Sequence, residues 1–170
     1  MSKIVIFGIG RGADVATRYF HDDSPHEIVA YTVDDSYADR KEFMGRPLIP
    51  FSRIEKEIPP KESQMFVLLG FQRMNALRAE KFAEAKRKGY FLASYISSRI
   101  MTCEQPKIGE NCFILEGNVF NYDVTIGNDV VMWYATTSEI FRLDDRLAGR
   151  GTASPEFRPR GREPTRRLWE

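Results

Sequence analysis

The sequence predicts an α/β protein, in which a Rossmann-like parallel sheet is followed by the start of a parallel β-helix. Short apolar runs alternate with helical patterns over the first hundred residues, and from Ile108 large apolar residues recur every six positions. The composition then changes, because 134–170 hold eight arginines and no lysine. We therefore expect an α/β domain over 1–100, an incomplete β-helix over 101–133 and an irregular, arginine-rich tail over 134–170.

Composition and charge narrow the classes of function. With 42% apolar residues among 170 the chain can bury a core, and its net charge of +1 is not the basic balance of a general nucleic-acid binder. No apolar run approaches the roughly 20 residues that cross a bilayer, and we expect the N-terminal run that ends at Gly8 to be too short and too glycine-punctuated for a signal peptide. Cys103 and Cys112 form no CxxC or Cys/His cluster, so we expect no metal site. These features predict a cytoplasmic protein with no nucleic-acid partner and no membrane insertion.

Apolar runs and helical patterns alternate along the first domain. Four apolar runs predict strands, and these cover 3–7, 26–33, 65–70 and 90–96. Amphipathic patterns predict helices over 14–20 and over 74–88, the second ending at Gly89. Strands that alternate with helices imply a parallel sheet with right-handed crossovers.

A glycine loop between the first strand and the first helix predicts a phosphate or nucleotide site. Gly8, Gly10 and Ala13 form a G-x-G-x-x-A pattern, whose glycines let a ligand approach the backbone at a helix N-terminus. Asp34 and Asp35 end the second strand, where a carboxylate can accept a hydrogen bond from a ribose hydroxyl or a base edge. A tight turn that needs glycine and an ordinary strand-end turn would explain the same residues. An NAD-type enzyme fits poorly, because its larger substrate domain is missing.

A six-residue period predicts the β-helix. Four hexads run from Ile108 to Val131, and the compact residues of each hexad lie four places after its large apolar one. The large residues stand at 108, 114, 120, 126 and 132, and the compact ones at 112, 118, 124 and 130. Two ordinary hairpins are the alternative. Four hexads make little more than one three-sided coil, so we expect further coils to be needed for stability.

The order of these segments resembles the NeuD/PglD-type sugar O-/N-acyltransferase family of hexapeptide-repeat proteins. The resemblance rests on the glycine loop, the Ser-Tyr-Ile-Ser-Ser-Arg stretch at 94–99 and the I-G-x-N-C-x-I hexad at Ile108, and it covers about 3–133. It implies that the α/β domain binds a nucleotide-linked sugar and that a left-handed β-helix forms a homotrimer. It also implies acetyl-CoA as the acyl donor, a histidine on the β-helix as general base, and a role in polysaccharide biosynthesis.

Matching the family's pattern residue by residue gives a set of substrate-binding positions. They are Gly8, Gly10, Arg11, Asp34, Asp35, Gly70, Asn75 and Arg78. The loop here departs from the family's Gly-His/Phe-Gly triplet, so Arg11 either meets a phosphate or is a solvated arginine.

The family's catalytic base has no counterpart in this sequence. The two histidines, His21 and His26, fall in the first domain, where we expect one to cap a helix end and the other to open a strand. We therefore assign no catalytic residue and expect a sugar acyltransferase that is catalytically impaired. A nucleotide-sugar-binding module without catalysis, or a Rossmann-type NAD-binding protein, is the alternative.

The tail after Trp133 supports a truncation. Back-translation of Ala135–Ile140 in a shifted frame permits Asn-His-Ile-Gly-Asp, a segment of the kind that carries the family's histidine. We therefore predict that 134–170 are a frame-shifted or truncated end, with a genuine basic arm as the alternative.

Overall fold

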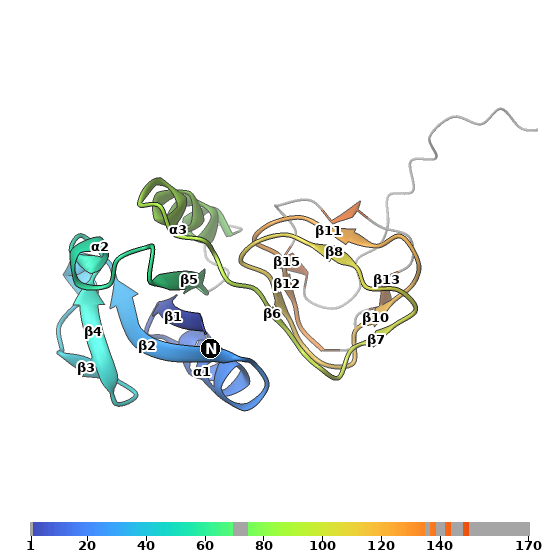
Figure 1. Cartoon of the computed structure of the whole chain (residues 1–170), viewed down its shortest axis with the longest axis horizontal. Helices are drawn as coiled ribbons and strands as arrows, with labels where there is room; N and C mark the ends of the chain where they lie inside the picture. The colour runs from blue at the N-terminus through green and yellow to red at the C-terminus, as the bar shows by residue number, and fades with distance from the viewer. Residues whose placement is uncertain (1, 70–74, 135–136, 139–141, 144–147, 150–170) are drawn as a thin grey trace, which may run out of the picture.

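The computed structural model describes residues 2–69, 75–134, 137–138, 142–143 and 148–149. The chain forms an α/β part and a β-helix that lie side by side (Figure 1). In order, the elements of the α/β part are β1 (Ser2–Phe7), α1 (Arg11–Asp22), β2 (His26–Val33), η1 (Asp35–Tyr37), β3 (Glu42–Phe43), β4 (Arg46–Pro50), α2 (Ile54–Glu57), β5 (Ser63–Val67) and α3 (Ala76–Arg87).

The five strands form one sheet in the order β3-β4-β2-β1-β5, parallel except at β3. β1 is central because its run of apolar residues is buried on both faces. Ile4 and Ile6 face α1, whereas Val5 and Phe7 face the side of α2 and α3. The predicted parallel sheet is confirmed, and the β3–β4 hairpin and α2 are additions that sequence patterns did not indicate.

The β-helix consists of two-residue strands on three sides. Its strands are β6 (Tyr95–Ile96), β7 (Met101–Thr102), β8 (Lys107–Ile108), β9 (Phe113–Ile114), β10 (Val119–Phe120), β11 (Thr125–Ile126), β12 (Val131–Met132), β13 (Thr137–Ser138), β14 (Arg142–Leu143) and β15 (Ala148–Gly149). They form three parallel sheets, in the orders β13-β10-β7, β14-β11-β8 and β15-β12-β9-β6. Strands on one side are stacked 18 residues apart, as Val119 is on Met101, so one coil holds three hexads.

The six-residue period predicts this packing correctly. The large residues of the hexads end strands β8 to β12, and Ile114, Phe120 and Ile126 are fully buried. The compact residues fill the same interior, where Cys112, Asn118, Val124 and Val130 are also buried. The alternative of two hairpins is wrong, because the strands of successive coils are parallel.

The β-helix strands extend beyond the segment over which the hexads were recognised. β6 lies before residue 101, and β13, β14 and β15 lie in the segment where we expected an irregular tail. These last three strands pair in parallel with β10, β11 and β12. β13 keeps the spacing of 18 residues, whereas β14 and β15 pair with residues 17 positions earlier, as Leu143 does with Ile126. Residues 150–170, where the rest of the expected tail lies, are outside the described residues.

The sequence-based expectation of a fourth sheet strand over 90–96 is wrong. Only Leu92 bridges the sheet, opposite Met65 in β5, and the chain then leaves to start the β-helix at Tyr95. Two residues further along β5, the backbone of Val67 bonds instead to the side chain of Asn111, which comes from the β-helix. The edge of β5 that a fourth strand would occupy is thus shared between the main chain and one side chain.

The two parts share a single aromatic core. Phe113 of β9 contacts the rings of Tyr19, Phe66, Tyr95 and Trp133, with centroids 5.4 to 6.2 Å apart. Because Phe66 belongs to the sheet, while Tyr95 and Phe113 stand at the starts of the first and second coils, the first side of the β-helix packs against the face of the sheet beside α1.

A polar contact at the end of α1 joins the same two parts. The carboxylate of Asp23 accepts hydrogen bonds from the Tyr95 hydroxyl at 2.7 Å and from the Ser98 N–H at 2.9 Å. These bonds, that of the Ser98 backbone foremost, hold the pKa of Asp23 below its ordinary value. Asp23 therefore anchors α1 to the start of the β-helix.

Candidate functional site

The glycine loop connects β1 to α1 at the carboxyl end of the sheet. Gly8 has φ +124°, and its N–H donates to the carbonyl of Thr32 in β2 at 2.8 Å. A Cβ at this position would lie 3.0 Å from the carbonyl oxygen of Leu68, just after β5. Gly8 is therefore required both by its backbone conformation and by the close approach of Leu68.

The next residues of the loop open the N-terminus of α1 to solvent. Gly10 is the N-cap, with φ −87°, and among the described residues no atom beyond its chain neighbours lies within 4 Å of the place where its Cβ would be. No side chain from the described part of the chain caps the helix, and Arg11 follows as an exposed first residue. Exposed N–H groups at a helix start favour a bound phosphate, and Arg11 adds positive charge beside them.

Asp34 ends β2 in a charged cluster. Its Oδ1 is 2.6 Å from Nζ of Lys81 in α3, and Lys81 also meets Glu84 at 3.0 Å. The Lys81 side chain is only 10% exposed and lies 5.8 Å from the ring centroids of Phe7 and Phe51. Burial opposes its charge, but the two carboxylates outweigh burial and raise the pKa of Lys81. One oxygen of Asp34 is thus used within the fold.

Asp35 points to a different element. Its carboxylate accepts hydrogen bonds from the Ser52 hydroxyl at 2.6 Å and the Ser52 N–H at 3.2 Å. These two bonds lower the pKa of Asp35. The acidic pair is therefore divided, with Asp34 turned to α3 and Asp35 holding the segment before α2.

The remaining predicted substrate positions have different surroundings. Gly70 lies outside the described residues. Asn75 has φ +65° just before α3, and its buried Oδ1 has no hydrogen-bond partner among the described residues. Arg78 is 1% exposed, and its Nε donates to Asp129 of the β-helix at 2.8 Å. The structure thus gathers Gly8, Gly10 and Arg11 into one loop and gives Arg78 a buried contact between the two parts.

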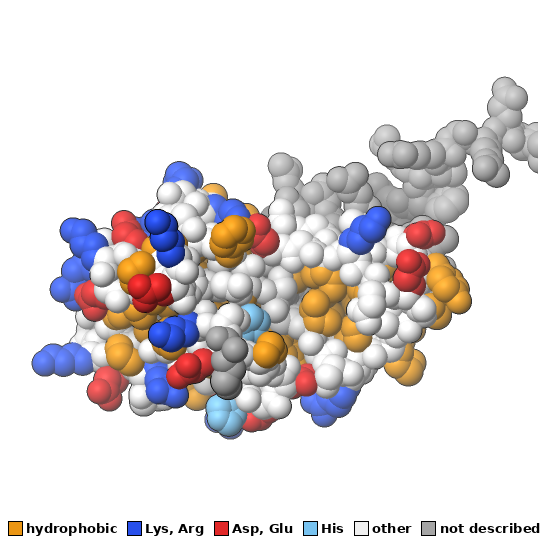
Figure 2. Space-filling view, viewed as in Figure 1, with side chains coloured by type: hydrophobic (Ala, Val, Ile, Leu, Met, Phe, Trp, Pro, Cys, Tyr) orange, Lys and Arg blue, Asp and Glu red, His pale blue; other side chains and the backbone are white. Residues whose placement is uncertain are grey.

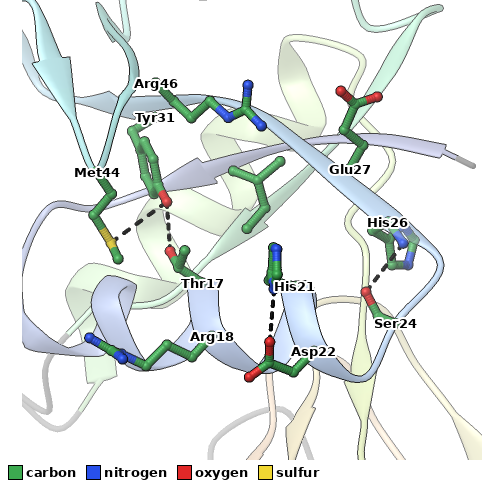
Figure 3. Close-up of a pocket in the computed structure, with 11 residues that line it drawn as sticks. Thr17, Arg18, His21, Asp22, Ser24, His26, Glu27, Tyr31, Met44 and Arg46 are labelled. Carbon is green, nitrogen blue, oxygen red and sulfur yellow. Dashed lines mark hydrogen bonds and ion pairs between the residues drawn. The ribbon is translucent and has the colours of Figure 1, made fainter.

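A groove of about 770 Å³ lies at a second place, between α1, β2 and the β3–β4 hairpin (Figure 3). The Tyr31 hydroxyl lies at its floor, 2.7 Å from Oγ1 of Thr17 and 3.8 Å from Sδ of Met44. Both histidines line this groove. His26 opens β2 as predicted, whereas His21 contacts the neighbouring Asp22 at 2.8 Å. None of the substrate positions predicted from the sequence lines it.

The surface of the α/β part carries charges of both signs. Figure 2 shows lysine, arginine and acidic side chains interspersed over the α/β part on the face drawn. In the part of the chain that the structure describes, no group of three His, Cys, Asp or Glu residues could hold a metal ion. No helix among the described residues is long and apolar enough to cross a bilayer.

Solved structures share this fold. PerB from Caulobacter crescentus, solved with CoA and GDP-perosamine, superposes with a TM-score of 0.63 at 20% identity, covering 82% of this chain and 63% of PerB. The acetyltransferase domain of PglB from Neisseria gonorrhoeae matches with a TM-score of 0.63 at 16% identity, over 82% of this chain and 65% of that domain. WeeI from Acinetobacter baumannii matches with a TM-score of 0.60 at 16% identity, over 81% of this chain and 63% of WeeI.

The chain has the fold of these acetyltransferases. The resemblance to NeuD/PglD-type proteins is thereby confirmed at the level of the fold. The chain spans less than two thirds of the length of each of the three structures. No protein-family model matches the sequence, and a search of curated proteins gives no match.

Sequence reasoning missed two residues that shape this site. Lys81 binds Asp34 across 47 residues, and Asn111 reaches Val67 across 44. The Ile-Gly-x-Asn pattern at Ile108 marks Asn111 as a corner residue of a β-helix, but it carries no information about the partner. Lys81 has no sequence signal, because a lysine in an amphipathic helix is normally solvated.

Proposed function

We propose that this chain is the nucleotide-sugar-binding part of a sugar acetyltransferase. The observation that carries the proposal is the order of its parts, an α/β part with a glycine loop followed directly by a β-helix, together with the fold shared with PerB and the PglB domain. In this proposal the α/β part is a Rossmann-like domain and the β-helix is left-handed. The protein would be soluble and cytoplasmic, and its reaction would belong to polysaccharide biosynthesis.

The nucleotide-linked sugar would bind at the carboxyl end of the sheet. The N-terminus of α1 and Arg11 suit its phosphates, and Gly10 leaves the backbone open to their approach. Asp34, Asp35 and Asn75 stand at the neighbouring strand and helix ends, where a ribose or base would be recognised. Gly70 belongs to the same proposed set, whereas Arg78 would act through its contact with the β-helix.

Acetyl-CoA would supply the acyl group along the β-helix, as the PglB domain has been solved with acetyl-CoA. The amine or hydroxyl of the sugar attacks the thioester carbonyl carbon, the C–S bond breaks, and the CoA thiolate takes up the proton lost by the attacking group. Exposed apolar side chains on the β-helix suit packing against other copies in a homotrimer. They are Ile96, Met101, Tyr122 and Tyr134.

We further propose that this chain transfers acetyl groups poorly. Its histidines, His21 and His26, line the groove of α1 and β2, so neither supplies an imidazole on the β-helix. This observation favours a second candidate function, a nucleotide-sugar-binding module without catalysis. NAD binding is the third and weakest candidate, because the β-helix follows where an NAD enzyme needs a substrate domain.

Binding and turnover distinguish these candidates. Calorimetric titration with GDP-, UDP- and dTDP-linked amino sugars should detect binding of at least one of them, and NADH should give none. Release of free thiol from acetyl-CoA should stay close to background. Robust turnover would refute the impairment, and binding of NADH without any nucleotide sugar would refute the main proposal.

A substitution at Gly10 locates the site. Gly10→Ala adds a methyl group into space that the described residues leave open, at a φ of −87° that alanine adopts. An alanine N-cap costs about 0.5–1 kcal/mol relative to glycine, and the smaller entropy of the unfolded alanine chain offsets much of that cost. The variant should therefore fold normally but bind the nucleotide sugar about tenfold more weakly, because the methyl group blocks backbone approach. Arg18→Ala, on the exposed side of the same helix, is the matched control and should bind as the wild type does.

A further inference from the structure

The side chain of Asn111 completes the outer edge of the sheet. Its Oδ1 accepts the Val67 N–H at 2.7 Å, and its Nδ2 donates to the Val67 carbonyl at 2.9 Å. The amide thus pairs with β5 as the peptide group of a neighbouring strand would. Asn111 is 1% exposed and has φ +57°, a left-handed conformation that asparagine tolerates at a β-helix corner.

Asp129 occupies the equivalent corner of the next coil, 18 residues later, and connects Asn111 to α3. Its Oδ1 accepts the second Nδ2 hydrogen of Asn111 at 2.7 Å and the Nε–H of Arg78 at 2.8 Å. The carbonyl of Asp129 accepts from Nη2 of Arg78 at 2.5 Å. Arg78 and Asp129 are 1% and 3% exposed, so this ion pair is formed away from water.

These contacts hold both sides of the candidate site from one place. Val67 is followed at once by Leu68, whose carbonyl oxygen lies against Gly8 of the glycine loop. Arg78 lies in the first turn of α3, which begins directly after Asn75. One corner of the β-helix is therefore bonded to the end of β5 and to the start of α3.

We propose that Asn111, Asp129 and Arg78 are positioning residues, through which the β-helix sets the geometry of the nucleotide-sugar site in the α/β part. Buried ion pairs contribute little net stability compared with apolar replacements, whereas their hydrogen bonds are strongly directional. A fixed orientation is what a ligand site requires, because small displacements of its loops weaken binding. The identity of the ligand, a nucleotide sugar, comes from the proposed function, and in this respect the inference rests on it.

The test compares two substitutions of Asn111 with a control at the other contact between the parts. Asn111→Ala leaves the Val67 N–H and C=O unpaired, and Asn111→Asp places a second carboxylate against Asp129 and the Val67 carbonyl. Asp23→Asn is the control. Asp23 also joins the two parts, but it bonds to Tyr95 and Ser98 and not to β5 or α3. All proteins are studied as full chains below their unfolding transitions, with thermal unfolding recorded for each.

We expect both Asn111 variants to bind the nucleotide sugar identified for the wild type about tenfold more weakly. Backbone hydrogen exchange should accelerate by about tenfold or more in the same variants at Val67, at Leu68, whose N–H donates to the Phe7 carbonyl, and at Glu80 in the N-terminal part of α3. Asp23→Asn should lower the unfolding temperature yet leave affinity and these amides unchanged. Asn111→Asp should be the more damaging of the two Asn111 variants.

Two results would overturn the inference. One is wild-type affinity in an Asn111 variant, and the other is equal loss of affinity in Asp23→Asn, which would show that any weakened contact between the parts acts alike. Should the wild type bind no nucleotide sugar, the proposed function fails. Hydrogen exchange then decides the positioning role alone, since unchanged exchange at Leu68 and Glu80 would refute it.

Discussion

The α/β part and the β-helix bury their residues in different ways. β1, β2 and β5 are five to eight residues long and are fixed by helices on both faces, whereas every strand of the β-helix has two residues and depends on the coils above and below. Their turns differ as well. Gly10 sits in open space, but a Cβ on Gly109 would lie 2.5 Å from Oδ1 of Asn128 and 2.7 Å from the Gly127 backbone. The glycine loop thus leaves space around Gly10 among the described residues, whereas the β-helix corner at Gly109 leaves none.

The largest expected effect concerns the core that the two regions share. Phe113→Ala should lower the free energy of unfolding by about 3–5 kcal/mol, because a fully buried ring in contact with four others leaves a large cavity. Phe120→Ala, equally buried but inside the β-helix, is the matched control. Urea unfolding combined with hydrogen exchange should show that Phe113→Ala weakens α1 and β5 as well as the β-helix, and that Phe120→Ala weakens the β-helix. Similar exchange patterns in the two variants would contradict a shared core.

The second prediction concerns the turns. Gly109→Ala should cost about 1–3 kcal/mol, since its methyl group collides with backbone atoms that cannot move separately. Gly10→Ala should change the free energy of unfolding by less than about 1 kcal/mol, because the loss of a glycine N-cap is offset by the smaller entropy of the unfolded chain. Denaturant titration of both variants gives the comparison, which would fail if the two alanines had equal effects.

Acid should weaken the anchor at Asp23. The pKa of this carboxyl is lower in the folded protein than in the unfolded chain, so its contribution is fully present above the unfolded value of about 3.9 and is lost as the pH falls through the folded value. Asp23→Asn should therefore be less stable than the wild type by about 1 kcal/mol at pH 7, with a difference that shrinks below pH 4. Chemical denaturation at pH 7, 4 and 3 measures it, and a constant difference would exclude Asp23 as the titrating group.

The smallest effect is one of reactivity. Burial raises the pKa of Cys112 to about 11, whereas Cys103 is exposed. At pH 8 a disulfide reagent should label Cys103 rapidly and Cys112 only after unfolding, because the buried thiol is both inaccessible and protonated. Cys103→Ser should abolish the rapid phase. A rapid phase that persists in this variant would show that the β-helix interior opens easily.

Local patterns predicted those parts of the fold that depend on neighbouring residues. The run ending at Phe7 is continuously apolar because both of its faces are buried, and the hexads from Ile108 bury residues at fixed intervals, so the local pattern was enough in each case. The segment 90–96 was misjudged, because a buried apolar run has the same appearance in a sheet and in a first β-helix strand. The two differ in long-range contacts, the pairing of Tyr95 with Phe113 and the bonds of Asn111 to Val67, which the local pattern does not contain.

The candidate site shows the same division. The loop at Gly8 and Gly10 could be predicted, because its backbone requirement is written in consecutive residues. The buried pairing of Arg78 with Asp129 could not, since nothing in either residue's own segment specifies a partner 51 positions away. Asp34 and Asp35 are adjacent in sequence, yet their side chains hold different elements, and this follows from tertiary contacts alone.

The position of Phe113 has a practical consequence for building chimeric enzymes. A recombination point at the start of the β-helix would separate Phe113 from Phe66 and Tyr19, leaving an uncovered aromatic face on the donated α/β piece. The first exchangeable boundary therefore lies beyond the second coil, which contains β9, so a transplanted α/β part should carry both coils with it. The sheet and the first two coils would then be moved between scaffolds as one unit.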